Sequence, residues 1–161
     1  MSTIARVFGI GAMLGSSLMA GTFFAFSTFV MGALARLPAA EGISAMQSIN
    51  VVVLNRWFLG VFVGTAGLAG ICAALAVTIE SEHANWMLIG ALAYVTGTFL
   101  VTVARNVPLN NRLAKLAAGD ADSLAVWRHY LQRWTQWNHV RTVGAAIATV
   151  GFARGSLGGA G

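Results

Sequence analysis

The hydrophobic and polar positions of this chain alternate as long apolar segments separated by short polar ones. Three apolar segments run from Val7 to Leu34, from Trp57 to Ile79 and from Trp86 to Val103, and a fourth ends at Phe152. An α-helix needs about 20 predominantly apolar residues to cross the hydrocarbon core of a bilayer. Because unpaired backbone groups are prohibitively costly in lipid, such segments form helices rather than strands. The pattern therefore predicts an all-α protein, a four-helix transmembrane bundle.

The fourth segment differs from the others because polar residues run directly into it. The apolar residues after Arg141 are too few to cross a bilayer alone, so the span must include the tract Trp134–Arg141. Ionisable groups at that depth are costly and usually functional. Asp120 and Asp122 are good helix starters. We therefore expect one long fourth helix that reaches Phe152 and whose first part extends into the cytoplasm.

Composition supports the membrane assignment. The chain is 57% hydrophobic and only 9% charged, against about 25% charged residues in soluble domains. The first apolar run is too long for the signal-peptide core of about 7–15 residues, so it is expected to be a retained span. Cys72 is the single cysteine, which excludes a disulfide framework within one chain. We expect one membrane domain over residues 1–154 and a flexible tail over residues 155–161.

The net charge of +5 comes mainly from basic loops between the apolar segments, so it indicates membrane topology rather than nucleic-acid binding. Most Lys and Arg residues lie in segments 36–56 and 104–141, and basic loops stay on the cytoplasmic side of a membrane. This bias predicts a multi-pass protein of the inner membrane with both termini outside. Within the first basic segment, Pro38–Asn55 is expected to form a short helix at the membrane interface.

Small residues form ridges on the first two apolar segments. The second segment carries Gly60, Gly64, Gly67 and Gly70 at helical spacing. Small positions let helices approach closely. Two interpretations remain open for this ridge: tight packing inside the bundle, or an interface through which the chain forms a homo-oligomer.

The predicted fourth helix has an aromatic inner face that also carries polar residues. With Trp134 as reference and about 100° per residue, one stripe includes Trp127, Tyr130, Trp137, Asn138, Arg141, Ala145, Ala148 and Phe152. His139 lies about 140° away from this stripe. The inward polar residues indicate a pocket. Alternatively, Arg141 only reaches the interface or stacks on a tryptophan, and His139 is an interfacial residue.

A second polar motif ends the third apolar segment. Because Pro108 lacks a backbone donor, we expect the helix to break there. Asn106 and Asn110 would then turn toward the mouth of the same pocket. The alternative is that both asparagines cap a helix end.

Other chemistries find little support in the residues. No carboxylate stands at metal-ligand spacing from His129 or His139, so neither a metal nor another cofactor is expected. No glycine cluster follows a strand, which excludes a dinucleotide or phosphate loop. The apolar segments contain no Asp or Glu that could relay protons in an ion-coupled pump.

The two polar motifs together resemble a known family. The residues are Asn106-Val-Pro-Leu-Asn110 and Trp134-x-x-Trp137-Asn138-His139-Val140-Arg141-Thr142, preceded by Phe23-Phe-Ala-Phe-Ser27. This combination is similar to the anthrone oxygenase-like family of small four-span membrane proteins, and the resemblance covers nearly the whole chain. It implies the fold, and it implies a reaction in which some members oxidise polyketide anthrones to anthraquinones with dioxygen.

Such a reaction needs a base, donors for an oxyanion and a dry aromatic pocket. Our hypothesis makes His139 the base, Asn106 and Asn138 the oxyanion donors, and Arg141 the electrostatic stabiliser. The substrate would contact Trp134, Trp137, Phe26 and Asn110.

Because His139 lies off the inner stripe, its role requires a kink or a pocket between helices. If neither exists, a water or enolisation assisted by Arg141 replaces it. The expected partners are membrane lipids and a hydrophobic aromatic small molecule. The rival interpretation is a non-enzymatic membrane protein that binds a lipid, a quinone or a partner helix.

Overall fold

The computed structural model describes residues 3–78, 81–117 and 123–158, and every element within these ranges is helical. The elements in chain order are α1 (Thr3–Ala25), the π-helical stretch η1 (Phe26–Val30), α2 (Met31–Leu34), α3 (Ala39–Val52), α4 (Arg56–Ala76), α5 (Glu82–Leu92), the π-helical stretches η2 (Ala93–Leu100) and η3 (Thr102–Asn106), α6 (Val107–Leu113) and α7 (Ser123–Leu157).

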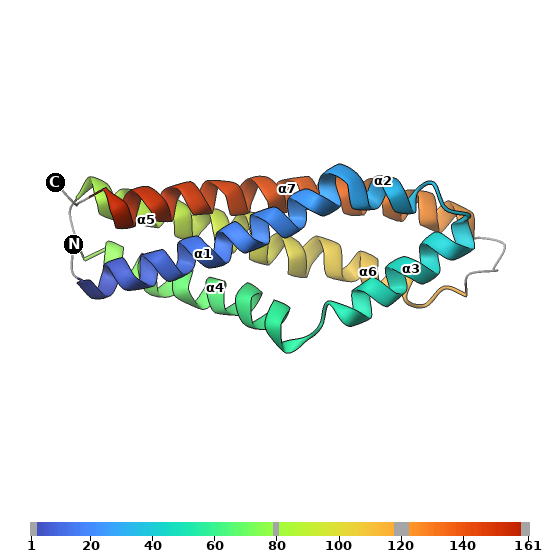
Figure 1. The fold of residues 1–161 in the computed structure, drawn as a ribbon, viewed down its shortest axis with the longest axis horizontal. Helices are drawn as coiled ribbons and strands as arrows, with labels where there is room; N and C mark the ends of the chain where they lie inside the picture. Colours follow the sequence, from blue (N-terminus) through green and yellow to red (C-terminus); the bar gives the residue numbers. More distant parts are fainter. Residues whose placement is uncertain (1–2, 79–80, 118–122, 159–161) are drawn as a thin grey trace.

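The long helices lie side by side, and α7 runs the length of the molecule (Figure 1). It packs mainly on α1 and α5, while α4 packs on the other side of the same two helices. The start of α1 and the end of α7 lie at the same end of the molecule (Figure 1). At the opposite end, α3 and α6 pack against each other and against the first part of α7.

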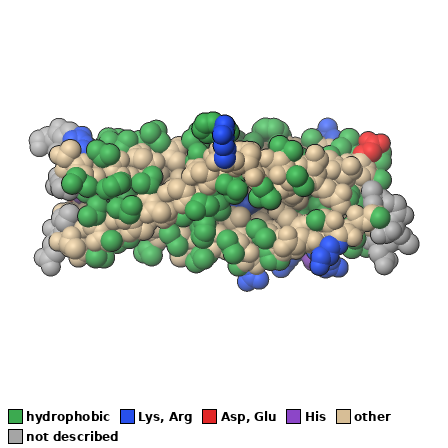
Figure 2. Space-filling view, turned by 90° about the horizontal axis from the view of Figure 1, so that it is seen from below, with side chains coloured by type: hydrophobic (Ala, Val, Ile, Leu, Met, Phe, Trp, Pro, Cys, Tyr) green, Lys and Arg blue, Asp and Glu red, His purple; other side chains and the backbone are tan. Residues whose placement is uncertain are grey.

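Three helices are long and apolar enough to cross a membrane: Thr3–Leu34, Arg56–Ala76 and Glu82–Leu113. Their outward side chains are largely apolar, and Figure 2 shows hydrophobic residues spread along one face with few charged groups among them. In water such a surface would favour association or aggregation, because large exposed apolar patches are interaction sites. A lipid environment removes that cost.

The expected break at Pro108 is wrong, because the third long helix continues to Leu113. The wide turns of η3 end at Asn106, and the amide of Val107 donates to the Thr102 carbonyl. Pro108 then occupies the first turn of α6. A proline is tolerated there because its missing donor would have no partner inside the new α-helical segment.

The long helix α7 confirms the predicted inner face. Its buried side chains include Trp127, Tyr130, Trp134, Asn138, Arg141, Ala145, Ala148 and Phe152, whereas Trp137 is only half-buried. The expected starters Asp120 and Asp122 lie outside the described residues. Helix α7 continues to Leu157, with Gly155 and Ser156 buried, and the domain and tail boundaries expected from the sequence stay predictions.

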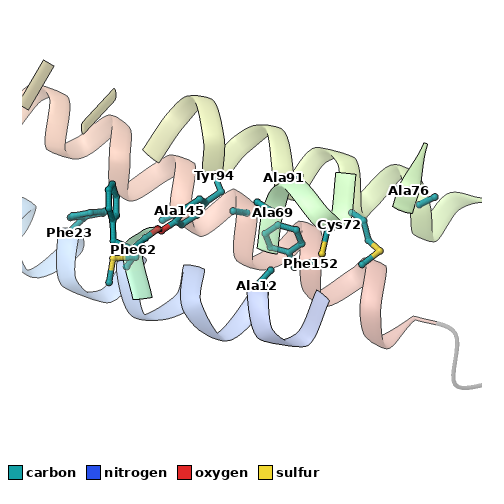
Figure 3. Close-up of a cluster of buried hydrophobic side chains, with 14 residues drawn as sticks. Ala12, Phe23, Phe62, Ala69, Cys72, Ala76, Ala91, Tyr94, Ala145 and Phe152 are labelled. Atoms are coloured by element: carbon teal, nitrogen blue, oxygen red, sulfur yellow. The ribbon is translucent and has the colours of Figure 1, made fainter. Parts of the chain in front are cut away.

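Two groups of buried hydrophobic side chains hold the helices together. The first joins α1, α4, α5, η2 and α7 and is rich in small residues, with Phe152 near Ala12 and Ala91 (Figure 3). The second lies at the other end, where Ile43 and Met46 of α3 pack on Trp127 and Tyr130 of α7. Helix α3 is therefore a packed element as well as the helix expected over residues 38–55.

Glycines mediate the closest helix contacts, but not those of the predicted ridge. A Cβ at Gly151 would lie 2.6 Å from the Gly90 nitrogen, and one at Gly144 would lie 2.8 Å from the carbonyl carbon of Gly97. By contrast, nothing lies within 4 Å of the Cβ position at Gly60, Gly64, Gly67 or Gly70. Packing within the bundle is therefore the wrong interpretation of the α4 ridge, and its use in a homo-oligomer stays a prediction.

A buried arginine in an aromatic cavity as candidate functional site

Arg141 is the centre of the candidate site. It lies on the inner face of α7, and only 5% of its surface is exposed. Nη2 donates to Asn138 Oδ1 at 2.6 Å, and Nη1 donates to Thr102 Oγ1 at 3.4 Å. Nε is buried and has no hydrogen-bond partner among the described residues. The guanidinium carries five N–H donors, so it keeps donor capacity for a further group.

The positive charge of Arg141 faces aromatic rings instead of a carboxylate. Its Cζ lies 4.3 Å from the centre of the Phe23 ring and 4.8 Å from that of Trp134. No hydrogen bond joins it to a carboxylate within the described part of the chain. Ring faces attract cations, but a buried charge is normally compensated by an opposite one. The arrangement therefore favours an anion that comes from outside the chain.

Asn138 fixes the position of Arg141. Asn138 lies about one helical turn before Arg141 on α7. The Nδ2 of Asn138 donates to the Phe23 carbonyl and to Ser27 Oγ, both at 2.7 Å. Its Oδ1 is thereby left to accept from Arg141. Because Asn138 is fully buried, these bonds are shielded from water and hold the arginine against η1 and α1. Asn138 is thus a positioning residue.

An apolar cavity of about 170 Å³ lies beside the guanidinium. Residues of α1, η1, α3, α4, η3, α6 and α7 surround it, and Arg141 and Thr102 form its polar end. Its aromatic lining consists of Phe23, Phe26, Phe58, Phe62 and Trp134. An apolar pocket with a few convergent polar groups is the usual form of a small-molecule site.

Asn110 forms a second polar contact of the cavity. Its Oδ1 accepts from Trp134 Nε1 at 2.8 Å and from Tyr130 Oη at 2.9 Å. Burial raises the pKa of the Tyr130 phenol, so this side chain stays neutral and donates. The first bond holds the indole ring of Trp134, which packs against Phe26 with ring centres 5.6 Å apart.

The structure brings most of the predicted site residues together. Four line the cavity: Phe26, Asn110, Trp134 and Arg141. Asn138 lies behind Arg141, as described above. Asn106 is also buried, and its Nδ2 donates to the Trp134 carbonyl at 3.2 Å, while its Oδ1 has no partner among the described residues. One N–H of its amide group is therefore used by the backbone of α7.

Two predicted residues lie elsewhere. Trp137 is outside the cavity lining and packs under the guanidinium of Arg105, 4.8 Å from the ring centre. His139 is exposed and faces a separate open groove that it shares with Arg128 and Gln132. The physical reason is that α7 is one uninterrupted α-helix from Ser123 to Leu157, so a rotation of about 100° per residue carries His139 away from the face of Asn138.

Sequence reasoning missed three residues of the site. Phe23 belongs to a motif of the sequence analysis, but no role was predicted for it. Its ring contacts Arg141, and its carbonyl accepts a hydrogen bond from Asn138. Thr102 and Ser27 supply the hydroxyls around that pair. Ser27 ends the same motif as Phe23. Hydroxyl residues are common in membrane helices because they bond to the preceding turn, so neither Ser27 nor Thr102 was expected to contact the Arg141–Asn138 pair.

Replacing Asn138 with alanine is expected to destabilise the protein. The change removes the partner of the Phe23 carbonyl and of a buried Arg141 donor, and each unsatisfied buried group costs about 1–3 kcal/mol. The half-buried Ser27 hydroxyl keeps Thr142 Oγ1 as a partner at 3.1 Å. Thermal unfolding in detergent, followed by circular dichroism, measures the loss. Gln136→Ala on the exposed face of the same helix serves as control. An unchanged midpoint for Asn138→Ala would show that the bonds contribute nothing.

Comparison with known proteins identifies a family. Among curated proteins and solved structures, nothing matches the chain. A family model described as anthrone oxygenase matches residues 54–151, more than half of the chain, including Asn106, Asn110, Trp134, Asn138 and Arg141. No group of three or more His, Cys, Asp or Glu side chains that could hold a metal occurs in the described ranges. The chain belongs to the anthrone oxygenase-like family.

Proposed function

We propose that this protein is a membrane-embedded oxygenase that oxidises an anthrone-like polycyclic aromatic with dioxygen. The observation that carries the proposal is the buried Arg141, which has no carboxylate partner among the described residues and faces an aromatic cavity. An anthrone has an acidic methylene opposite its carbonyl, and loss of a methylene proton places negative charge on the carbonyl oxygen. A fixed cation at that oxygen stabilises the anion as it forms.

The reaction balances without a further reductant. The methylene carbon loses a proton, and the electron-rich enolate reduces dioxygen by one electron. Recombination of the two radicals and protonation give a hydroperoxide on the same carbon. That carbon then loses its remaining hydrogen as the O–O bond breaks, which yields the quinone carbonyl and one water. Overall, one anthrone and one dioxygen give one anthraquinone and one water.

Each side chain of the cavity has a defined part in this proposal. Arg141 binds the enolate oxygen through its free donor, and Asn138 keeps the guanidinium in place. Trp134 and Phe26 stack on the ring system. The cavity lining contains no carboxylate and no histidine, so the proton leaves to a water after Arg141 has raised the acidity of the methylene. His139 is not assigned the role of base.

The membrane arrangement is part of the same proposal. Helix α7 forms the fourth span from about Trp134 onward, completing a four-helix membrane bundle, and its first turns project into the cytoplasm. The polar end of the cavity then lies within the bilayer near its cytoplasmic side. The start of α1 and the end of α7 share one end of the molecule, and in this proposal both termini lie on the outer side of the inner membrane.

Isotope incorporation tests the proposed reaction. Purified protein in detergent would be incubated with emodin anthrone under ¹⁸O₂, and the quinone would be analysed by mass spectrometry. We expect one labelled oxygen per quinone, formed faster than with heat-denatured protein. Tight binding of the anthrone with conversion only at the spontaneous rate would contradict the enzyme and support the rival, a membrane protein that binds a lipid or a quinone.

Replacing His139 with alanine is expected to leave turnover within about twofold of the wild type, because the imidazole lies outside the cavity. Initial rates of quinone formation provide the measurement. A true general base contributes about 100- to 10,000-fold. A loss of that size, in a variant with an unchanged unfolding midpoint, would show that His139 acts on the substrate.

A further inference from the structure

The outer rim of the cavity is apolar and exposed. Four of its lining residues are Leu54, Leu59, Val103 and Val107, with exposed fractions of 66%, 37%, 51% and 39%. They lie where α4 begins after the α3–α4 link and where η3 passes into α6. Both elements belong to helices long and apolar enough to span a membrane. An apolar rim on the side of such helices faces lipid rather than water.

The two ends of the cavity therefore differ in chemistry. Arg141 is the only charged residue in its lining, and it lies at the deep end with Thr102. A ligand that arrived from water would pass a rim with no Lys, Asp or Glu to attract or orient it. The rings of a ligand that arrives from the bilayer stay in an apolar environment at the rim, and an anionic atom of that ligand meets a charged partner only at Arg141.

Cavity size adds a constraint on orientation. A volume of about 170 Å³ is close to the roughly 150 Å³ of an engineered apolar cavity that binds benzene. A molecule of three fused rings thus fills the space beside Trp134 and extends through the rim. Its apolar end then remains among the side chains of Leu54 and Val103 and the lipid beyond them.

The rim is a preformed opening. Between α3 and α4, Asn55 accepts hydrogen bonds from the amides of Trp57 and Phe58, both at 3.0 Å, and donates to the Val52 carbonyl at 3.0 Å. These three bonds set the end of α3 and the start of α4 relative to each other. The opening therefore needs no unwinding of either helix.

We propose that the ligand enters sideways from the lipid phase, through a portal between the α3–α4 link and η3. It is a flat apolar molecule with one acidic oxygen, and this oxygen enters first to reach Arg141. Leu54 and Val103 are the residues that limit its passage. The orientation rests on the proposed function, which makes Arg141 the anion site, whereas the portal follows from the rim alone.

Matched valine variants in vesicles test the portal. Val103 and Val150 are both about half exposed, but only Val103 lines the cavity, so Val103→Phe blocks the rim and Val150→Phe is its control. Vesicles preloaded with anthracene-2-carboxylate or neutral anthracene are mixed with proteoliposomes. Binding is followed as quenching of tryptophan fluorescence, because Trp134 borders the cavity.

We expect entry of both probes to be slowed about tenfold or more by Val103→Phe and within about twofold of wild type for Val150→Phe. Leu54→Phe, on the opposite side of the rim, is expected to act like Val103→Phe. Wild-type rates should follow the amount of probe per lipid. Unchanged rates in both rim variants, rates set by the aqueous probe concentration, or no quenching in the wild type would each overturn the portal.

Comparison of the charged probe with the neutral one tests the anion site at Arg141 separately from the portal. Wild type should bind the carboxylate more tightly than anthracene, and Arg141→Gln should abolish that preference. Equal affinities in the wild type would overturn Arg141 as the anion site and the oxygen-first orientation, while slowed entry in Val103→Phe would still support the portal.

Discussion

Replacing Arg141 with methionine is expected to reduce anthrone oxidation by about 100- to 1,000-fold, the usual effect of removing one donor to an oxyanion. The same change should leave the fold about as stable as the wild type, because removal of a buried charge offsets the loss of the hydrogen bond that Asn138 Oδ1 accepts. Arg141 is a buried cation without a carboxylate partner in the described structure, and replacing buried charges with apolar side chains is often neutral or stabilising. Initial rates and unfolding midpoints in detergent measure both effects.

A large loss of activity with little change in stability makes the prediction specific. Arg105 provides the control, since it also stacks on a tryptophan but lies exposed outside the cavity. Arg105→Met should keep full activity. If Arg141→Met lost stability and activity together, the arginine would be a structural element that stacks on Phe23 and Trp134, as the alternative interpretation of the sequence holds.

Replacing Gly151 with alanine is expected to cause the largest loss of stability. The new Cβ would lie 2.6 Å from the backbone nitrogen of Gly90 and 2.7 Å from its Cα. Backbone cannot move aside as a flexible side chain can, so the cost should reach or exceed the upper end of the roughly 1–3 kcal/mol typical of overpacking. Thermal unfolding in detergent and the yield of monodisperse protein provide the readout.

Gly67→Ala in α4 is the matched control. Nothing lies within 4 Å of the Cβ position at Gly67, and alanine is the better helix former by about 1 kcal/mol in aqueous helices. The control should therefore unfold at the wild-type temperature or above it. Equal losses in both variants would mean that the α5–α7 contact is not the feature that requires glycine at residue 151.

The sequence allowed the inner face of α7 to be predicted because helical geometry relates side chains on one element directly. Trp134, Asn138 and Arg141 follow the 3.6-residue period, and all three are buried. The same geometry explains why His139, adjacent in sequence, lies in another groove. A motif that is continuous in sequence thus divides between two faces of the helix.

Contacts between helices could not be predicted in the same way. Gly90 and Gly151 meet because of how α5 crosses α7, and the sequence contains no information on crossing angles that pattern reasoning can extract. The more conspicuous glycines of α4 face open space instead. For the same reason, the sequence indicated neither Phe23 nor Thr102 as a neighbour of Arg141, since each comes from a different helix.

The guanidinium of Arg141 is fixed in position, and its charge is nevertheless not neutralised by a carboxylate among the described residues. A hydrogen-bond network from Asn138 holds the guanidinium in place, which orders it before a ligand arrives. Its charge is nevertheless left without a carboxylate partner among the described residues. Positioning a cation while leaving its charge available is the arrangement that stabilises an anionic intermediate.

Dioxygen consumption most directly tests whether the buried Arg141 supports anthrone oxidation without a metal. Wild type, Arg141→Met and Arg105→Met would be compared in detergent with emodin anthrone, each with and without a metal chelator. We expect dioxygen uptake by wild type and Arg105→Met to continue in the presence of the chelator, and uptake by Arg141→Met to fall to the spontaneous rate. Uptake by Arg141→Met at the wild-type rate would contradict the role of the buried cation, and uptake abolished by the chelator would contradict oxidation without a metal.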